Sequence, residues 1–393
     1  MSMQVHAYTR PKLFFLPSMG ILCLLLASVL AGCNLSPGAR GHTFQGKLNL
    51  LQVPAPYSLP GQIVLGPDGN LWFPAVAYEN FTTGKPSGAI GQLTPAGTFL
   101  LFPMPTPNTY PLDIAFGHDG KLWFSAFQGN GRLAPNVDQA PRFSGGHSAL
   151  GQMSQDGNFH MFTLPSPTIS PGSIAVGADG NLWFTDVSSL GESANNAWVN
   201  KIGRVTPSGV FTEFPLTLRK ATDFIDLLIA GPDGNLWFSI ESYLPDYSTF
   251  GEMGRITPQG AVTIFTLGKF AEPRDMTIGP DNNIWFSGGG FIGRITMHGQ
   301  VHLFTPVPQA NAFNRIYTSG ITTGSDGALW FATQNVAVGR VTTAGAFKFY
   351  PFPPNTYFDN GSSSLDMGNL RGIVAGGDGT LWLTNDGQIG HFV

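Results

Sequence analysis

The sequence predicts an all-β protein, a seven-bladed β-propeller of four-stranded blades. An octapeptide of the form GPDGNLWF, first seen at residues 66–73, recurs seven times along the chain. Its tryptophans, from Trp72 to Trp382, lie roughly 50 residues apart, and a second motif of the form IGRVTPSG follows most of them. A repeat of this length that contains four short strands is typical of a propeller blade.

Composition agrees with many short strands joined by tight turns. The chain of 393 residues is 42% hydrophobic and 12% aromatic but only 11% charged, with 51 Gly and 31 Pro. Such a chain can bury a large core and is too apolar to be disordered. Its formal net charge of −4 provides no basic surface, so we expect no nucleic-acid partner.

Residues 1–32 have the anatomy of an export signal. Arg10 and Lys12 precede an apolar stretch that ends in Leu-Ala-Gly-Cys at Cys33. This end resembles the lipobox of bacterial lipoproteins, in which the Cys thiol accepts a diacylglycerol. The alternative is a transmembrane anchor, because the apolar run is long enough to span a bilayer. The resemblance implies an exported protein of the bacterial cell envelope, attached to the membrane only through the lipid on Cys33.

The mature protein is expected to be one domain on a short tether. We assign residues 33–42 to the tether and residues 43–393 to the propeller, and we expect a monomer. The only other cysteine, Cys23, lies inside the signal. The mature chain therefore has no disulfide and no thiolate metal site.

Each repeat contains four predicted strands. The first is a short apolar run such as residues 173–176, and the second is Leu-Trp-Phe, whose continuous apolar character suits a strand buried on both faces. The third is Ile-Gly-Arg-Val-Thr, and the fourth alternates in polarity, as in residues 210–216. The seventh repeat ends at Val393 without a fourth strand, and residues 47–53 have that strand's pattern. We therefore expect the N-terminal strand to complete the C-terminal blade and close the ring.

The acidic residue of the octapeptide is predicted to build a turn. In Gly-Pro-Asp-Gly-Asn, Pro presets φ, Asp accepts hydrogen bonds from nearby amides, and the second Gly takes a positive φ. In the fifth copy Asn282 replaces that Gly, and Asn tolerates the left-handed conformation better than most other residues. A calcium loop would need several carboxylates, whereas each copy has one.

The motifs P-x-x-I-x-x-G-x-D-G-x-L-W-F and I-G-R-[IV]-T-P-x-G resemble the virginiamycin B lyase (streptogramin lyase) family of seven-bladed propellers over residues 43–393. That family opens a cyclic depsipeptide antibiotic at its ester bond by magnesium-dependent elimination, a carbon–oxygen lyase reaction. The resemblance implies a base that removes an α-proton, and a metal or donor that stabilises the enolate-like transition state. It places two His, one Glu and one further acidic residue near the central axis.

This chain departs from the family pattern at most of these positions. The two His positions align with Asp226 and Arg274, and the Glu position aligns with Gly288, while the acidic residue is kept as Glu272. Arg274 stays protonated and cannot be a base, whereas Asp226 could act as one if burial raised its pKa. For an active lyase, we expect Glu272 and Asp226 to be catalytic and Glu272 to be the ligand of a magnesium ion.

None of the eight histidines precedes a predicted innermost strand. We place His118 and His298 in turns, His160 and His302 on outer strands, and His147 in an insertion. The family's base is therefore missing from its usual position.

Because the family's catalytic His and Glu positions are not kept, we expect a ligand- or protein-binding module, and a lyase with altered catalytic groups is the alternative. The ligand-binding residues expected near the axis are charged: Arg274, Asp275, Arg371, Asp113, Asp186 and Glu241. Such mixed charge can bind a polar ligand, or it can form a solvated ring of salt bridges.

Long connections are predicted on the face where the first strand begins and the second ends. They include residues 125–149 and 351–370, and they are rich in Tyr, Phe, Asn and Ser. That composition suits a small molecule, a glycan or a cell-surface protein as partner. A third alternative is a purely structural cell-surface module.

Overall fold

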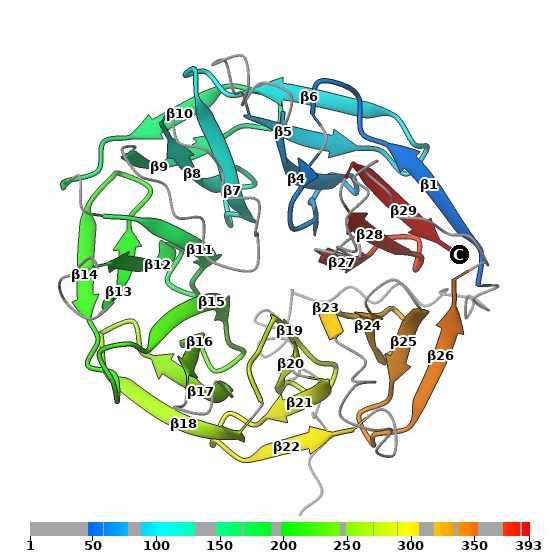
Figure 1. Cartoon of the computed structure of the whole chain (residues 1–393). Coiled ribbons are helices and arrows are strands. Elements are labelled where there is room, and N and C mark those ends of the chain that lie inside the picture. The colour runs from blue at the N-terminus through cyan, green and yellow to red at the C-terminus, as the bar shows by residue number, and fades with distance from the viewer. Residues whose placement is uncertain are drawn as a thin grey trace, which may run out of the picture. The chain divides into compact units, whose positions relative to one another are not determined.

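Seven antiparallel sheets are arranged around one axis in the computed structural model of this chain (Figure 1). The structure describes residues 46–57, 59–77, 88–129, 147–166, 169–189, 198–243, 249–269, 271–288, 290–305, 318–333, 337–352, 372–385 and 387–393. The predicted signal, Cys33 and the tether lie outside these residues. Within them, no helix is long and apolar enough to cross a membrane.

The two inner strands of each sheet come from the first apolar run and the Leu-Trp-Phe segment of one repeat. The innermost strands are β3 (Val64–Leu65), β7 (Thr109–Phe116), β11 (Pro171–Val176), β15 (Phe224–Ala230), β19 (Asp275–Ile278), β23 (Thr318–Thr323) and β27 (Gly372–Ala375). The second strands are β4 (Leu71–Val76), β8 (Leu122–Gln128), β12 (Leu182–Ser189), β16 (Leu236–Tyr243), β20 (Ile284–Gly288), β24 (Leu329–Thr333) and β28 (Leu381–Asn385). The first blade also has β2 (Leu59–Pro60), which pairs with the end of β4.

The two outer strands follow in the same order in every blade. The third strands are β5 (Gly88–Leu93), β9 (His147–Met153), β13 (Trp198–Val205), β17 (Thr249–Ile256), β21 (Phe291–Ile295), β25 (Ala337–Val341) and β29 (Gln388–Phe392). The outermost strands are β6 (Phe99–Pro103), β10 (Phe159–Phe162), β14 (Phe211–Pro215), β18 (Val262–Lys269), β22 (Val301–Phe304), β26 (Phe347–Pro351) and, from the N-terminal side, β1 (Leu48–Gln52). The predicted fold class is confirmed.

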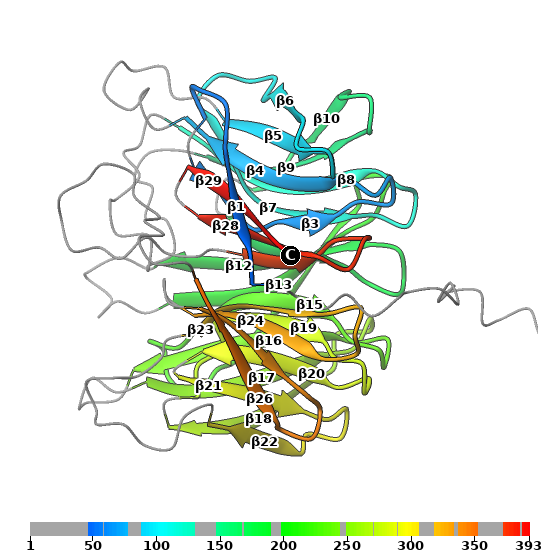
Figure 2. The same ribbon diagram turned by 90° about the vertical axis from the view of Figure 1, so that its right-hand side faces the viewer.

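The ring is closed by β1, as the repeat count predicts. β1 pairs antiparallel with β29, with Leu48 opposite Phe392 and Gln52 opposite Gln388, and Figure 2 shows the two strands side by side. The backbones of Lys47 and Val393 exchange hydrogen bonds of 3.2 and 2.9 Å beyond the strand. The C-terminal blade therefore has four strands, and β29 is not left as an unpaired edge.

Each motif tryptophan packs against the next blade. Trp72 lies in one apolar cluster with Leu122 and Phe124 of the second blade, and Trp382 of the last blade packs with Leu71 and Phe73 of the first. The seven motif tryptophans are at most 2% exposed. The Leu-Trp-Phe strands are thus buried on both faces because their side chains form the cores between blades.

The turn Asp has the predicted structural role and also contacts the Trp and Arg of its own repeat. In the fifth blade Trp285 Nε1 donates to Asp281 at 2.8 Å and Arg294 Nη1 at 3.3 Å. The same Arg294 atom reaches the carbonyl of Thr343 in the next blade at 3.3 Å. Asn282 takes the expected left-handed conformation, with φ of 56°. The octapeptide therefore ties a hairpin to its own blade and to the neighbouring one.

The motif glycine of Ile-Gly-Arg is needed for close packing. A Cβ on Gly293 would lie 2.0 Å from the ring of Phe286 on the adjacent strand. The Phe of Leu-Trp-Phe covers this glycine, so no larger residue fits there.

Several strands are longer than the sequence pattern indicates. Residues 185–189 and 239–243 continue the second strands of blades three and four, and pair with residues 198–202 and 249–253. His147 begins β9 instead of lying in an insertion; His160 and His302 lie on outer strands, as predicted. Most of the long connections at 125–149 and 351–370 lie outside the described residues.

Candidate functional site

Blades four and five bring four charged side chains to one end of the ring. Because neighbouring strands are antiparallel, the start of an innermost strand lies beside the end of the second strand; Phe224, for example, pairs with Glu241. Asp226 near the start of β15, Glu272 and Arg274 just before β19, and Glu241 near the end of β16 therefore share this face. We call these four residues the axial cluster.

A β-bulge positions Asp226. The register between β15 and β16 shifts between Ile225 and Leu228, and the extra backbone N–H, that of Leu227, donates to the buried hydroxyl of Ser239 at 2.9 Å. The Asp226 side chain is left exposed to solvent on an innermost strand. Bulges of this kind commonly re-aim a side chain beside a functional site.

Glu272 and Arg274 form an ion pair at the mouth of the ring. Arg274 Nη2 donates to Glu272 Oε1 at 3.1 Å. Glu272 is 8% exposed, and its second oxygen, Oε2, is buried with no hydrogen-bond partner in the structure. The pair thus combines an exposed guanidinium with a buried carboxylate that has an unsatisfied acceptor.

Asp226 and Glu241 of the axial cluster have raised pKa values. Burial raises the pKa of Glu241, which is 4% exposed, to about 7; Arg274 opposes this rise, and Asp226 and Glu272 add to it. The surrounding protein also raises the pKa of Asp226, against the effect of Arg274. Among the described residues, Glu241 is thus influenced by two neighbouring carboxylates and by the guanidinium of Arg274.

The position aligned with the family's Glu has no room for a side chain. Gly288 has φ of 151°, and a Cβ there would lie 1.9 Å from the carbonyl oxygen of Glu272 and 3.0 Å from Arg274 N. Arg274 N also donates to the carbonyl of Ser287 at 2.6 Å. The backbone of residues 272–274 occupies the space that a glutamate would need.

Two predicted ligand-binding residues serve the ring itself. Asp113 accepts hydrogen bonds from Ile114 N and, in the next blade, from Ile174 N, both at 2.8 Å. Asp275 does the same with Met276 N at 2.8 Å and Ile321 N at 2.9 Å. Each carboxylate thus ties its innermost strand to that of the following blade.

Burial dominates the electrostatics of these two carboxylates. It raises the pKa of Asp113 to about 6 and that of Asp275 to about 7, although backbone hydrogen bonds act in the opposite direction. Both oxygens of each residue are occupied, so neither residue is available to a ligand without breaking a contact between blades.

Asp186 does not join the axial cluster. It is 1% exposed, accepts a hydrogen bond from Ser170 N at 2.8 Å, and lies 3.9 Å from Lys201 Nζ. Burial raises its pKa to about 6. Arg371, the last predicted ligand-binding residue, lies outside the described residues.

A second polar group in blade four has no counterpart among the predicted site residues. Glu252 is 7% exposed and lies 3.9 Å from Arg219, whose guanidinium stacks at 4.8 Å over Phe250. Glu252 alternates with Gly251 along β17, so its side chain is on the opposite face of the blade from Glu241, which pairs with Gly251. A carboxylate in an otherwise apolar strand is the sequence signal that marks it.

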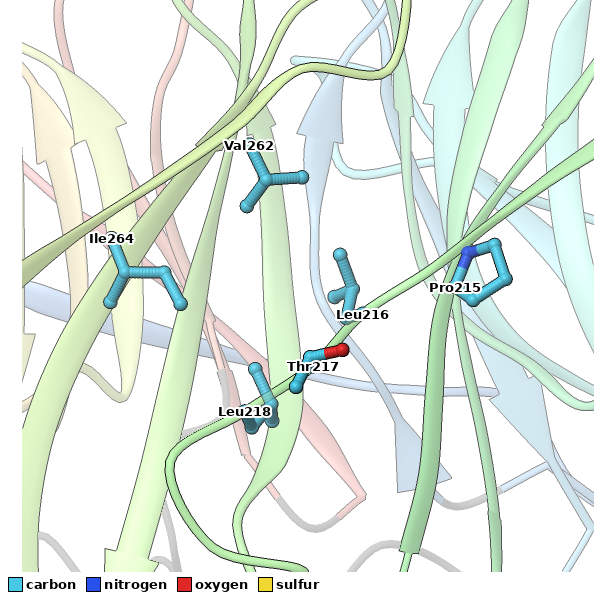
Figure 3. A pocket seen from close by; sticks show the side chains of 6 residues that line it. All are labelled: Pro215, Leu216, Thr217, Leu218, Val262 and Ile264. Carbon is cyan, nitrogen blue, oxygen red and sulfur yellow. The ribbon is translucent and has the colours of Figure 1, made fainter.

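An apolar groove of about 370 Å³ lies on the outer wall between blades three and four (Figure 3). Its lining consists of Pro215, Leu216, Thr217, Leu218, Val262 and Ile264. It has one hydroxyl and no titratable side chain, so it supplies no group for chemistry.

The axial cluster does not fit a magnesium ion. No group of three or more His, Cys, Asp or Glu in the described part of the chain could hold a metal. The oxygen Oε1 of Glu272 is already occupied by the guanidinium of Arg274, so it is not free to coordinate a metal ion. We therefore derive no step through a metal.

Comparison with known proteins places these observations in a family. The sequence profile described as the virginiamycin B lyase family matches residues 132–244 and 247–393. The comparison with curated proteins found no match.

Solved structures share the fold. A streptogramin B lyase structure is similar with a TM-score of 0.64 and 24% identity, covering 88% of this chain and 97% of that one. A catalytically inactive virginiamycin B lyase from Staphylococcus aureus, solved with quinupristin, has a TM-score of 0.61 and 25% identity, covering 88% and 98%. The structure of YCF48 bound to D1 peptide has a TM-score of 0.55 and 13% identity, covering 88% and 95%.

Proposed function

The chain belongs to the virginiamycin B lyase family, and from this premise we propose that it is a ligand-binding propeller without the family's lyase chemistry. Its ligand is a small molecule, a glycan or a segment of a cell-surface protein, bound at the axial cluster of Asp226, Glu241, Glu272 and Arg274. The proposal rests on the site, because one propeller fold supports many functions.

The observation that carries the proposal is the backbone at Gly288. The resemblance assigns a catalytic Glu to this position, and here a Cβ would meet the Glu272 carbonyl at 1.9 Å. Asp226 and Arg274 stand where the resemblance assigns histidines, and a permanently protonated guanidinium cannot remove an α-proton. The aligned positions thus hold neither the Glu nor the His that the resemblance assigns to the elimination.

The geometry supports binding for a different reason. Asp226 and Arg274 are exposed, whereas Glu241 and Glu272 are buried, and Oε2 of Glu272 has no hydrogen-bond partner. A few convergent polar groups at one end of a rigid ring are typical of a ligand site.

Array binding with mapped variants tests this function. The purified mature domain is applied to glycan and peptide arrays, and each hit is measured again with Asp226→Asn and Glu241→Gln. We expect both variants to weaken binding, while Glu252→Gln, which neutralises a buried carboxylate on the opposite face of blade four, leaves it unchanged. The proposal is contradicted if no array compound binds, or if both axial variants bind every hit as tightly as the wild type does.

A second candidate function is elimination with altered catalytic groups. The observation in its favour is the pKa of Glu241, which burial raises to about 7, because a base works best when its pKa lies near the working pH. The test is incubation with a streptogramin B, with and without Mg²⁺, followed by mass spectrometry. We expect no linear product; product that is lost in Glu241→Gln or Glu272→Ala would establish a lyase instead.

We also propose that the domain is exported and anchored through Cys33. The support is the Leu-Ala-Gly-Cys tetrapeptide at the end of residues 1–32. Expression of the full chain in a bacterial host with labelled palmitate should label the membrane fraction. Cys33→Ser should abolish the label and release the protein from the membrane; a label that persists contradicts acylation at this residue.

A further inference from the structure

We infer that the group bound by the axial cluster is cationic, a primary ammonium or a guanidinium carried by a small polar ligand. This inference rests on the proposed binding function and names the chemical class of its ligand.

The first observation is the balance of charge. Asp226, Glu241 and Glu272 contribute three carboxylates, and among the described residues Arg274 contributes the guanidinium that acts on them. Since Arg274 is paired with Glu272 at 3.1 Å, Asp226 and Glu241 have no cation of their own within the described residues. An anionic ligand would meet this excess of like charge, whereas a cation would reduce it.

The second observation is an unsatisfied acceptor inside the site. Glu272 Oε2 is buried without a hydrogen-bond partner, and Glu241, which Glu272 influences, is 4% exposed. A buried acceptor without a donor costs free energy. An ammonium group, with three N–H donors and no acceptor, supplies the kind of donor that Glu272 Oε2 lacks.

The third observation concerns protons. Burial and the neighbouring Asp226 and Glu272 raise the pKa of Glu241 to about 7, and the surrounding protein raises the pKa of Asp226, so part of the cluster holds protons near neutral pH. A bound cation favours the ionised carboxylates and displaces those protons. Other carboxylates on the ring wall, Asp113 and Asp275, have raised pKa values too and share this electrostatic field.

The test compares amines with their neutral twins. The probes are putrescine against N,N′-diacetylputrescine, glucosamine against N-acetylglucosamine, and end-blocked Gly-Lys-Gly against its ε-acetylated form. Binding to the mature domain is measured by calorimetry at pH 7 in two buffers that differ in ionisation enthalpy. We expect at least one amine to bind about tenfold or more tightly than its twin, with release of protons.

Matched variants assign the binding to the cluster. Glu241→Gln keeps the shape of the side chain and removes its charge, so we expect about tenfold or greater loss of amine binding and less proton release. Glu252→Gln, which alters a carboxylate of similar burial on the opposite face of the same blade, should leave both quantities unchanged.

Each outcome decides the inference. Equal binding of an amine and its neutral twin, equal binding by wild type and Glu241→Gln, or no binding of any amine at 10 mM overturns the cationic ligand. In those cases a neutral or anionic array hit that is lost in Asp226→Asn leaves the binding function standing without the cationic ligand. If no array hit depends on the axial variants, the proposed function fails as well.

Discussion

At the scale of one residue, Gly288 determines the path of the backbone at the site. Its φ of 151° is rare for L side chains, and a Cβ would lie 1.9 Å from the Glu272 carbonyl. We expect Gly288→Ala to lower the free energy of unfolding by about 1–3 kcal/mol and to displace Glu272 and Arg274. Urea denaturation measures the loss.

A matched glycine distinguishes this effect from a general effect of alanine. Gly377, in the hairpin turn of the last blade, has nothing within 4 Å of an added Cβ and no positive φ. Gly377→Ala should stay within about 0.5 kcal/mol of wild type. Similar losses in both variants would show that the close approach at Gly288 does not determine the cost.

Asp275 gives a prediction for pH. Burial raises its folded-state pKa to about 7 from 3.8, so the folded state binds its proton more tightly than the unfolded state. This contribution to stability is therefore greatest near pH 4 and is lost as pH rises to about 7. Asp275→Asn cannot titrate, so its stability should fall less between pH 5 and pH 8 than that of wild type.

The measurement is chemical denaturation of both proteins at the two pH values. The difference between their slopes isolates Asp275, because the other titrating groups are common to both proteins. Asp275→Asn should also be less stable than wild type at each pH, since an amide cannot accept both backbone N–H groups. Parallel pH profiles would contradict the assignment.

Sequence reasoning at this scale succeeded where the chemistry is local. The turn role of Asp281 and the left-handed Asn282 follow from residues two positions away, and both are confirmed. The hydrogen bond from Asp275 to Ile321 N depends on how two blades meet. No pattern within one repeat contains that contact, so Asp275 was predicted to be a ligand-binding residue.

Arg294 connects two blades at the scale of the strand. Its Nη1 atom reaches Asp281 and the Thr343 carbonyl, each at 3.3 Å, and its guanidinium lies 5.5 Å from the ring centre of Trp285. Lysine keeps the charge but not the planar fork that makes these contacts together. We expect Arg294→Lys to cost about 1–2 kcal/mol of unfolding free energy, measured by thermal and urea denaturation.

The control for that prediction is an exposed ion pair. Lys121 lies 3.6 Å from Asp119 with both side chains well exposed, and Lys121→Ala should cost less than about 0.5 kcal/mol. An equal cost for the two substitutions would mean that Arg294 contributes only an ordinary surface charge.

The lengths of the strands differ most from those that the sequence predicts. The segment after Trp183, Phe-Thr-Asp-Val-Ser-Ser, is polar enough to resemble a loop, yet it pairs with residues 198–203 as strand. Pairing with a neighbouring strand, which a single segment does not reveal, decided the outcome. Pairing with a neighbouring strand also extends β16 to Tyr243, so Glu241 lies in the sheet and is buried.

The whole ring is predictable because the sequence shows both the length of the repeat and the number of repeats. Seven octapeptides and a missing last strand lead directly to closure by the N-terminal segment, and the pairing of β1 with β29 confirms it. The axial cluster was partly predictable, because position within a repeat gives position around the axis. Which of its carboxylates are free for a ligand depends on contacts between blades.

Closure by β1 gives the prediction for the whole molecule. Leu48 and Leu50 pack against a core that includes Leu381 and Leu383. Deleting residues 46–52 removes this packing and leaves β29 as an unpaired edge. We expect the free energy of unfolding to fall by about 3–5 kcal/mol, the Tm to fall by roughly 5–10 °C, and the protein to self-associate through the exposed strand.

Calorimetry and size-exclusion chromatography with light scattering measure these effects, with Asn49→Ala on the solvent side of β1 as the control. A deletion that stays monomeric with an unchanged Tm would show that the ring is held by the cores between blades without its closing strand.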